Sequence, residues 1–430
     1  MRRPPPPEII GLLDIGTAKV CCAIVERTMA DGALSTGDPT ALRVLGFAQL
    51  KSEGVRGGMI VDLDKAEDCV SRVIGEAERL AAVRLEDVLV AVSNARLRSE
   101  YLTARSDLSA GRVRRHDLHR LSKTAATYAG RNGRKIIHLS DALYTIDEDV
   151  GIRAPLDMIG TTIACQFHVV TADPAPLRNT TALLGRCYLG VKDFPLAAWM
   201  SACAAATAEE RQSGVVCIDI GAGATKLAVV AEGRLIFADT LAVGGANLTH
   251  DVAVMLTAPL AEAERIKTLY GTLSGGQFAP NTTISEWRAN EGEFVAFKAH
   301  RGDRQETTRA ELAQALYPRA RRQLEMVDER LSRSKIARRL AKSTVLTGGG
   351  SQLVGLASLA SELLGMPVRL GQPSALDGSD DMLTSPAMAT IVGMAQAGHA
   401  STGDVGANAL WDDSQSSYLG RMERWLRESF

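Results

Sequence analysis

The feature that most constrains this chain is a short motif that occurs twice. Residues 11–26 read GLLDIGTAKVCCAIVE, and residues 214–232 read GVVCIDIGAGATKLAVVAE. In each copy an apolar strand runs into Asp-Ile-Gly, a turn of small residues follows, and a second apolar strand begins. A single copy would be typical of an ordinary tight hairpin whose glycine permits a positive φ. Two copies indicate a duplicated domain, and we expect the second turn to be one residue longer.

Two glycine-rich hairpins that face each other are suited to binding a polyphosphate. Their exposed N–H groups form concave anion sites, and Asp14 and Asp219 can hold a hydrated Mg²⁺ through its waters. The hydroxyl of Thr17 and the ammonium of Lys19 add to the phosphate shell. The residues predicted to bind phosphate are Gly16, Thr17, Ala18, Lys19, Gly221, Ala222, Gly223 and Ala224.

A third glycine cluster lies in STVLTGGGSQLVGL, which ends at residue 356. A strand runs into Gly348, Gly349 and Gly350, and an amphipathic helix is expected over 351–364. The missing side chains would allow the backbone to lie flat against a planar group, and the helix N-terminus would favour negative charge nearby. Standing alone, the cluster would be a flexible strand-to-helix turn.

Two further features lie between the second hairpin and this cluster. Gly244 and Gly245 form a turn before a helix that is expected to start near residue 249. A predicted helix then places Glu264 and Lys267 one turn apart, and by spacing alone these two form a solvated i,i+3 pair.

Composition excludes several functional classes. The formal net charge is −1 and aromatic residues make up 4% of the chain, so neither a basic field nor stacking platforms point to nucleic acid. No apolar run is long enough to span a membrane. The seven cysteines lack C-x-x-C spacing and are expected to be reduced thiols of a cytoplasmic protein. His116 and His119 could share a helix face as metal ligands, but RRHDLHR is more typical of a solvated helix.

Both ends of the chain differ from the rest. Residues 1–8 are expected to form a disordered, Pro-rich tail, and residues 398–417 a flexible linker. The end, YLGRMERWLRESF, is predicted to be an amphipathic helix over 418–430 that is too short to be stable alone in water. It could pack on the protein's own core, but arginines opposite its apolar face favour a membrane interface. The predicted membrane-binding residues are Leu419, Met422, Trp425, Leu426 and Phe430.

Together these segments resemble the bacterial cell-division FtsA family of the actin, heat-shock chaperone and sugar kinase ATPase superfamily. GLLDIGTAKV and GVVCIDIGAGATKLAV are similar to that family's two phosphate loops, AEAERIK to its adenosine-contacting helix, and VLTGGGSQLVGL to its adenosine loop. The resemblance implies an α/β, actin-like (ribonuclease H-like), two-lobed ATPase fold with an inserted 1C subdomain. It assigns to ATP binding Gly244, Gly245, Glu264, Lys267, Gly348, Gly349 and Gly350.

The resemblance also implies a function. A member of this family would bind ATP with Mg²⁺, form actin-like filaments and dock on the cytoplasmic side of the inner membrane at the division site. It would recruit the tubulin-like FtsZ ring, whose C-terminal tail would contact Arg309 and Arg319, and it would engage later division proteins. Two alternatives on the same fold stay open, a pilus-assembly actin-like protein and a sugar or acetate kinase.

The domain boundaries follow from the same resemblance. Subdomain 1A would comprise 9–93 and 172–211, and the inserted subdomain 1C would comprise 94–171. Subdomain 2A would comprise 212–255 and 336–397, and subdomain 2B would comprise 256–335.

The second phosphate loop departs from the family pattern of three glycines, Thr, a variable residue and Asp. Here the hydroxyl of Thr225 is displaced by one residue and Lys226 replaces the acid. Because a one-residue shift along a strand turns a side chain to the opposite face, we expect Thr225 to miss the phosphate and Lys226 to face outward. The sequence shows no evident general base, so ATP binding is expected with slow or absent hydrolysis.

Overall fold

The structure is a computed structural model that describes residues 7–28, 41–93, 96–273, 294–299, 302–379 and 381–397. The chain divides into two compact units. The segment Arg98–Pro174 belongs to the smaller unit, and the larger unit is built from the residues that precede and follow this segment. The smaller unit therefore interrupts the larger one in the sequence, as an inserted domain does.

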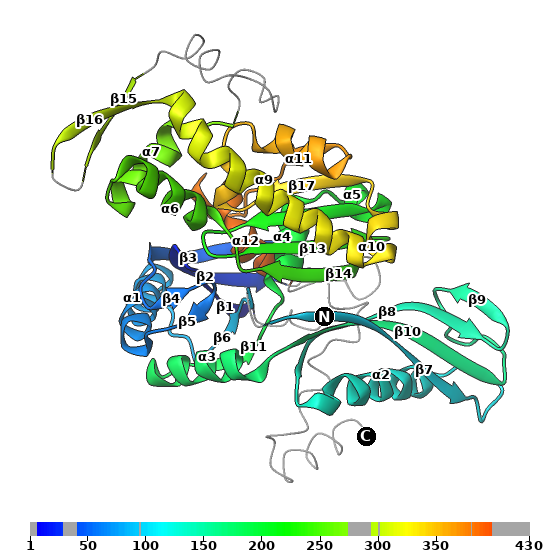
Figure 1. Ribbon diagram of the computed structural model, residues 1–430. Coiled ribbons are helices and arrows are strands. Elements are labelled where there is room, and N and C mark those ends of the chain that lie inside the picture. The colour runs from blue at the N-terminus through cyan, green and yellow to red at the C-terminus, as the bar shows by residue number, and fades with distance from the viewer. Residues whose placement is uncertain are drawn as a thin grey trace. The chain divides into compact units, whose positions relative to one another are not determined.

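Two five-stranded sheets form the larger unit, and both have the same strand order (Figure 1). The first sheet contains, in spatial order, β3 (Ala41–Lys51), β2 (Lys19–Thr28), β1 (Glu8–Ile15), β6 (Asp87–Val90) and β11 (Gly190–Asp193). The second contains β14 (Arg234–Leu241), β13 (Thr225–Ala231), β12 (Val215–Ile220), β17 (Ser343–Thr347) and β18 (Val368–Leu370). In both sheets the first three strands pair antiparallel and the others parallel. This shared topology is the structural counterpart of the repeated motif.

The two Asp-Ile-Gly hairpins also share one register. Ile15 pairs with Val20 in the first hairpin, and Ile220 pairs with Thr225 in the second. The two turns therefore have the same length, and the expectation that the second is one residue longer is wrong. Lys19 therefore corresponds by register to Ala224 and not to Lys226.

The helices described in the larger unit cover both sheets. They are α1 (Leu63–Ala81), α3 (Pro174–Arg186), α4 (Ala197–Ala205), α5 (Ala208–Ser213), α6 (Gly245–Leu256), α7 (Leu260–Tyr270), α9 (Arg309–Arg333), α10 (Lys335–Leu340), α11 (Leu356–Leu364) and α12 (Ala389–Ala397). Two short hairpins complete the unit: β4 (Val55–Arg56) with β5 (Met59–Ile60), and β15 (Phe294–Lys298) with β16 (Arg304–Thr308).

Two apolar helices join the sheets. Helix α12 packs on β1 and β2, α4 packs on β12 and β13, and the two helices pack against each other. Leu12, Met200 and Ile391 belong to one buried cluster at this junction. Because both helices are buried along most of their length, their sequences are apolar on nearly every face.

Local capping explains where several elements begin. The side chain of Thr308 accepts a hydrogen bond from the Glu311 amide (3.2 Å), and Glu311 accepts one from the Thr308 amide (3.0 Å). This capping box opens α9. Helices α4 and α5 are separate elements, because Thr207 forms a second capping box with Glu210 and starts α5. The helix expected over 351–364 begins only at Leu356, after a 3₁₀ turn over Gly349–Gln352.

The smaller unit is a four-stranded sheet covered by one described helix. The order is β7 (Arg98–Asp107), β10 (Thr162–Ala172), β8 (Lys135–Ile146) and β9 (Asp149–Ile152), and the helix is α2 (Arg115–Ala129). Leu121 of α2 and Phe167 of β10 lie in its buried core. His116 and His119 are exposed on α2, as expected of a solvated helix.

Some predictions concern the ends of the chain. Glu8, assigned from sequence to the tail, is already part of β1 and forms an ion pair with Arg27. The linker 398–417 and the predicted membrane helix 418–430 lie outside the described residues. Within the described ranges, none of the helices has the length and apolarity needed to cross a bilayer. All seven cysteines are free thiols.

Candidate functional site

The two hairpins meet at their tips. A Cβ built on Gly223 would overlap the hydroxyl oxygen of Thr17 and would lie 2.9 Å from the Cα of Gly57. The same Thr17 oxygen accepts a hydrogen bond from the Gly58 amide (3.1 Å). The turn between β4 and β5, where Gly57 and Gly58 lie, therefore supports the contact between the loops. This turn was not predicted from sequence, although its adjacent glycines are typical of one.

Each hairpin is closed by an equivalent hydrogen bond. Gly16 N donates to Lys19 O (3.0 Å), and Gly221 N donates to Ala224 O (2.9 Å). Among the hydrogen bonds of the described residues, none uses the amides of Thr17, Ala18, Ala222 or Gly223 as donors. These tip residues are exposed or half-buried, so their amides are available to an anion.

Asp219 lies at the centre of a buried polar cluster just behind the second hairpin. Its Oδ2 accepts hydrogen bonds from Ser201 (2.6 Å) and Thr390 (3.2 Å), and it forms an ion pair with Lys226 Nζ (2.7 Å). Lys226 Nζ also donates to the Thr390 hydroxyl (3.0 Å). Ser201 and Thr390 come from α4 and α12. Neither residue was predicted from sequence, although a hydroxyl in an otherwise apolar helix indicates a buried polar contact.

The structure corrects the prediction that Lys226 faces outward. Asp219 and Lys226 are directly opposite partners across β12 and β13, and opposite residues of an antiparallel pair lie on the same face of a sheet. Lys226 is therefore 7% exposed and points toward the acids. Thr225 points to the other face, where its hydroxyl donates to Val243 O (2.7 Å) and accepts from Gln323 (2.6 Å). Both partners of the Thr225 hydroxyl are thus groups of the protein, and the expectation that it misses the phosphate stays a prediction.

Asp14 lies within electrostatic reach of the same cluster. Burial raises the pKa of the Asp14 carboxyl, while Lys226 and Lys19 act in the lowering direction and Asp219 raises it further. Burial alone would lower the pKa of the Lys226 ammonium, but Asp219 and Asp14 raise it above the ordinary lysine value. Lys226 is therefore charged. The Asp219 carboxylate is thus already paired with an ammonium group 2.7 Å away, which does not fit a Mg²⁺ site, because the ion needs anionic oxygens that are not already neutralised.

The turn at Gly244 and Gly245 holds the second hairpin from behind. Helix α6 begins at Gly245, earlier than the expected start near residue 249. The Gly245 amide donates to Gly221 O (2.9 Å) and the Ala246 amide donates to Ala222 O (2.8 Å). The first amides of α6 therefore fix the backbone of the second hairpin.

The third glycine cluster lies against the same hairpin. Gly348 has a φ of +83°, and Cβ atoms built on Gly348 and Gly350 would collide with the Ile220 backbone and side chain. Gly349 differs, because a Cβ there would meet only Ala387 at 3.7 Å. The expectation that a helix N-terminus directly follows this cluster is wrong, since α11 starts at Leu356.

Glu264 and Lys267 form their predicted pair and are joined by a third residue. Lys267 Nζ lies 2.7 Å from Glu264 Oε2 and donates to Thr249 Oγ1 (2.9 Å) and Gly245 O (3.2 Å). Thr249 also donates to Glu264. Burial alone would raise the pKa of Glu264, but the hydrogen bonds from Lys267 and Thr249 hold it below its ordinary value. The pair thus links α7 to the start of α6, beside Gly350.

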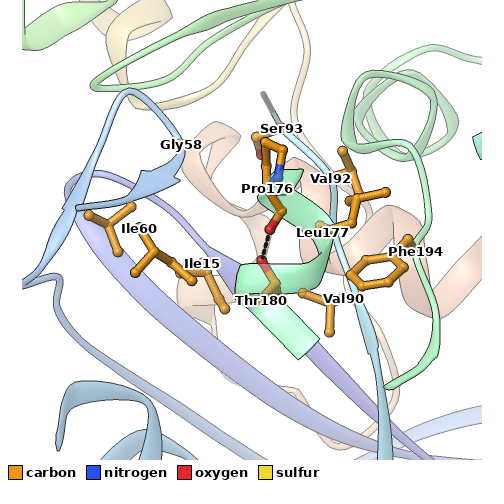
Figure 2. Close-up of a pocket in the computed structure, with 12 residues that line it drawn as sticks. Ile15, Gly58, Ile60, Val90, Val92, Ser93, Pro176, Leu177, Thr180 and Phe194 are labelled. Carbon is orange, nitrogen blue, oxygen red and sulfur yellow. Dashed lines mark hydrogen bonds between the residues drawn. The ribbon is translucent and has the colours of Figure 1, made fainter. Parts of the chain in front are cut away.

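A small cavity lies next to the first hairpin. Figure 2 shows its apolar walls, which include Ile15, Ile60 and Phe194, and the hydrogen bond from Thr180 Oγ1 to Pro176 O (3.1 Å). Its volume is about 30 Å³, which is room for one or two water molecules. The cavity is therefore too small for a nucleotide.

The two arginines predicted to bind a partner lie on α9. Arg309 is its first residue, and Arg319 follows about 15 Å along the axis. The Arg319 guanidinium is held by Asp251 of α6 through two hydrogen bonds, of 2.7 and 2.9 Å. An acidic partner would have to share Arg319 with Asp251.

Two sheets of one strand order, with acid-and-glycine hairpins that meet at their tips, define an actin-like, two-lobed fold. Solved structures agree at the level of fold. A chain of the PilM–PilN type IV pilus biogenesis complex is 18% identical with a TM-score of 0.60, covering 90% of this chain and 98% of that one. MreB5 of Spiroplasma citri bound to ADP is 13% identical with a TM-score of 0.52, covering 91% and 96%.

Sequence comparison gives the family. The family model described as cell division protein FtsA matches residues 216–393, and the SHS2 domain inserted in FTSA matches residues 94–171. The cell division protein FtsA of Rhizobium meliloti (strain 1021) is 33% identical, across 98% of this chain and 95% of its own length. The chain belongs to the FtsA family of cell division proteins.

Proposed function

We propose that this protein is an ATP-binding, polymerising scaffold of cell division that tethers the FtsZ ring to the cytoplasmic face of the inner membrane. The proposed ATP binding rests on the contact between Gly223 and Thr17, which brings the tips of the two hairpins together. Family membership favours neither the pilus-assembly nor the kinase alternative.

The arrangement around the tips supports binding of ATP. The amides of Thr17, Ala18, Ala222 and Gly223 would receive the phosphates. Mg²⁺ would arrive on the ATP phosphates themselves. The pair Glu264–Lys267 and the backbone of Gly349 would contact the adenosine, since both lie beside the start of α6 and the third glycine cluster.

The surroundings of Asp219 support binding of ATP with slow or absent hydrolysis. A general base must be free to accept a proton from water. Asp219 already accepts from Ser201, Thr390 and Lys226 through one oxygen. Burial raises the pKa of Asp14 against the lowering effect of Lys226 and Lys19, so only the contacts of Asp219 weigh against a general base.

Membrane attachment would come from residues 418–430, whose apolar residues include Met422, Trp425 and Leu426. One such helix would bind a membrane weakly and reversibly. Several copies on one filament would hold firmly, because the first contact raises the effective concentration of the others. Attachment and polymerisation would therefore reinforce each other.

The FtsZ tail would dock at α9 near Arg309 and Arg319. Because Arg319 is shared with Asp251, Arg319→Ser and Asp251→Asn should act in opposite directions. We expect Arg319→Ser to weaken binding of an FtsZ tail peptide about tenfold, by loss of a charged hydrogen bond. Asp251→Asn, which leaves Arg319 available, should preserve or strengthen it. Equal loss in both variants would contradict this docking site.

Electron microscopy of the full chain on lipid vesicles with ATP tests the whole proposal. We expect filaments on the lipid surface, and loss of the surface layer when 418–430 are removed. Trp425→Glu should abolish vesicle co-sedimentation while binding of fluorescent mant-ATP persists. Trp411→Glu, in the linker, is the matched control and should co-sediment normally. Co-sedimentation of the Trp425→Glu protein would refute the membrane helix.

A further inference from the structure

Lys226 is placed where a bound cation would neutralise the acids of the two hairpins. Its Nζ lies 2.7 Å from Asp219 Oδ2, and the side chains of this ion pair are 9% and 5% exposed. The ammonium is also held by Thr390 at 3.0 Å and acts electrostatically on Asp14. A lysine fixed in this way is an internal cation between the two repeats.

The oxygens of Asp219 are occupied. Oδ2 accepts from Ser201, Thr390 and Lys226. Oδ1 is packed against Gly348, so closely that a Cβ at that position would overlap it. A hydrated metal ion needs acceptor oxygens that its waters can reach, and the side chain of Asp219 is only 5% exposed.

The charge already present leads to the same result. The Lys226 ammonium lies 2.7 Å from Asp219 Oδ2, and it also acts electrostatically on Asp14. A divalent cation placed beside Asp219 would therefore meet this ammonium group at short range. By Coulomb's law its binding would be opposed at short range.

The two repeats differ at the position directly opposite the acid. By register, the position opposite Asp14 in the first hairpin is Cys21, and the position opposite Asp219 in the second is Lys226. Cys21 is buried in the apolar core of the first sheet. Of these two cross-strand positions, only the one in the second repeat carries a cation.

From these contacts we propose that the Lys226 ammonium takes the place of a protein-held divalent cation, so that this chain binds adenine nucleotide without a requirement for Mg²⁺. The inference rests on the proposed ATP-binding function. It assigns to Lys226 a positioning role: the ammonium neutralises the two acids, which would otherwise repel the nucleotide phosphates.

The affinity test compares mant-ATP binding with Mg²⁺ and with EDTA in the full chain. The parent protein should bind equally well in both conditions. Lys226→Met keeps the length of the side chain and leaves Asp14 and Asp219 with an uncompensated charge. This variant should bind at least about tenfold more weakly in EDTA than in Mg²⁺, the loss expected when a charged contact is removed. Lys65→Met removes one charge from an exposed position of α1 and should behave like the parent. A parent protein that loses its mant-ATP in EDTA overturns the proposal.

A second measurement needs no nucleotide, so failure of ATP binding and failure of this inference are distinguishable. Thermal unfolding of the parent should be unchanged by Mn²⁺. Lys226→Met should unfold at a lower temperature, because it leaves a buried acid unpaired, and Mn²⁺ should restore part of the loss. If that variant does not fold, Lys226→Met combined with Asp219→Asn removes both charges and should fold without any response to Mn²⁺. A parent that is stabilised by Mn²⁺ as strongly as the variant overturns the inference.

Discussion

Gly348 is packed against the Oδ1 of Asp219, in a backbone conformation with a φ of +83° that L side chains rarely adopt. A Cβ at this position would overlap the carboxylate and would also lie 2.6 Å from Ile220 O. The third glycine cluster thus encloses the acid of the second hairpin. Only glycine combines easy access to this positive φ with the absence of a Cβ that would overlap the carboxylate.

The first prediction compares Gly348 with its neighbour Gly349. Gly348→Ala should lower the free energy of unfolding by about 2 kcal/mol or more, from backbone strain and overlap. Gly349→Ala should fold like the parent, since its Cβ meets only Ala387 at ordinary distance. Urea unfolding measures both. If Gly349→Val binds mant-ATP as tightly as the parent, this glycine is structural and does not contact adenosine.

The second prediction concerns the contact between the two hairpins. Gly223→Ala should push the loop away from Thr17 and Gly57, because the neighbours on that side include backbone atoms that cannot rotate aside. We expect a roughly tenfold loss of ATP affinity with little loss of secondary structure. Gly75→Ala, in the exposed part of α1 with open space around it, is the control and should bind normally. Unchanged affinity in Gly223→Ala would show that the contact between the tips does not matter for the nucleotide.

The third prediction concerns Lys267, which holds Glu264 and Thr249 together. Lys267→Met should weaken ATP and ADP binding to the same extent, about tenfold, because the pair is assigned to the nucleoside and not to the terminal phosphate. Isothermal titration with both nucleotides measures this. Arg265→Met, on the same helix and paired with Glu262, should leave both affinities unchanged. If only the affinity for ATP fell, Lys267 would be assigned to the phosphates and not to the nucleoside.

The fourth prediction is a pH dependence of the smaller unit. Burial lowers the pKa of His138, in β8, to about 4 from an ordinary value of 6.5. Between these two values the unfolded chain binds more protons at this residue than the folded one. The free energy of unfolding should therefore be constant above pH 6.5 and fall as the pH drops toward 4, by about 3 kcal/mol at most.

Hydrogen exchange of the β8 amides, corrected for the intrinsic effect of pH, measures this fall. His138→Phe should remove most of it. His116→Gln, a change at an exposed histidine of the same unit, should retain it. Equal protection of the parent at pH 7 and pH 5 would contradict the assignment to His138.

Much of the larger unit could be predicted from sequence. The strands of the Asp-Ile-Gly hairpins, the capping box at Thr308 and the turns at Gly244 and Gly348 are encoded by residues close together in the chain. Apolar alternation, capping and glycine conformations act over a few residues. In the smaller unit the strands over 98–107 and 149–152 could not be predicted in this way, because most of their residues are exposed or half-buried and show no clear apolar alternation. The first also pairs with β10, which is distant in sequence.

The sequence by itself determined that two acid-and-glycine hairpins exist and that they belong to a duplicated fold. Tertiary structure alone decided which side chains surround the acids. The direction of Lys226 depends on its register opposite Asp219, and the hydroxyls of Ser201 and Thr390 reach that acid only because α4 and α12 pack between the sheets. Contacts between residues far apart in the chain leave no local pattern, so the charge at the centre of this site became visible only in the folded molecule.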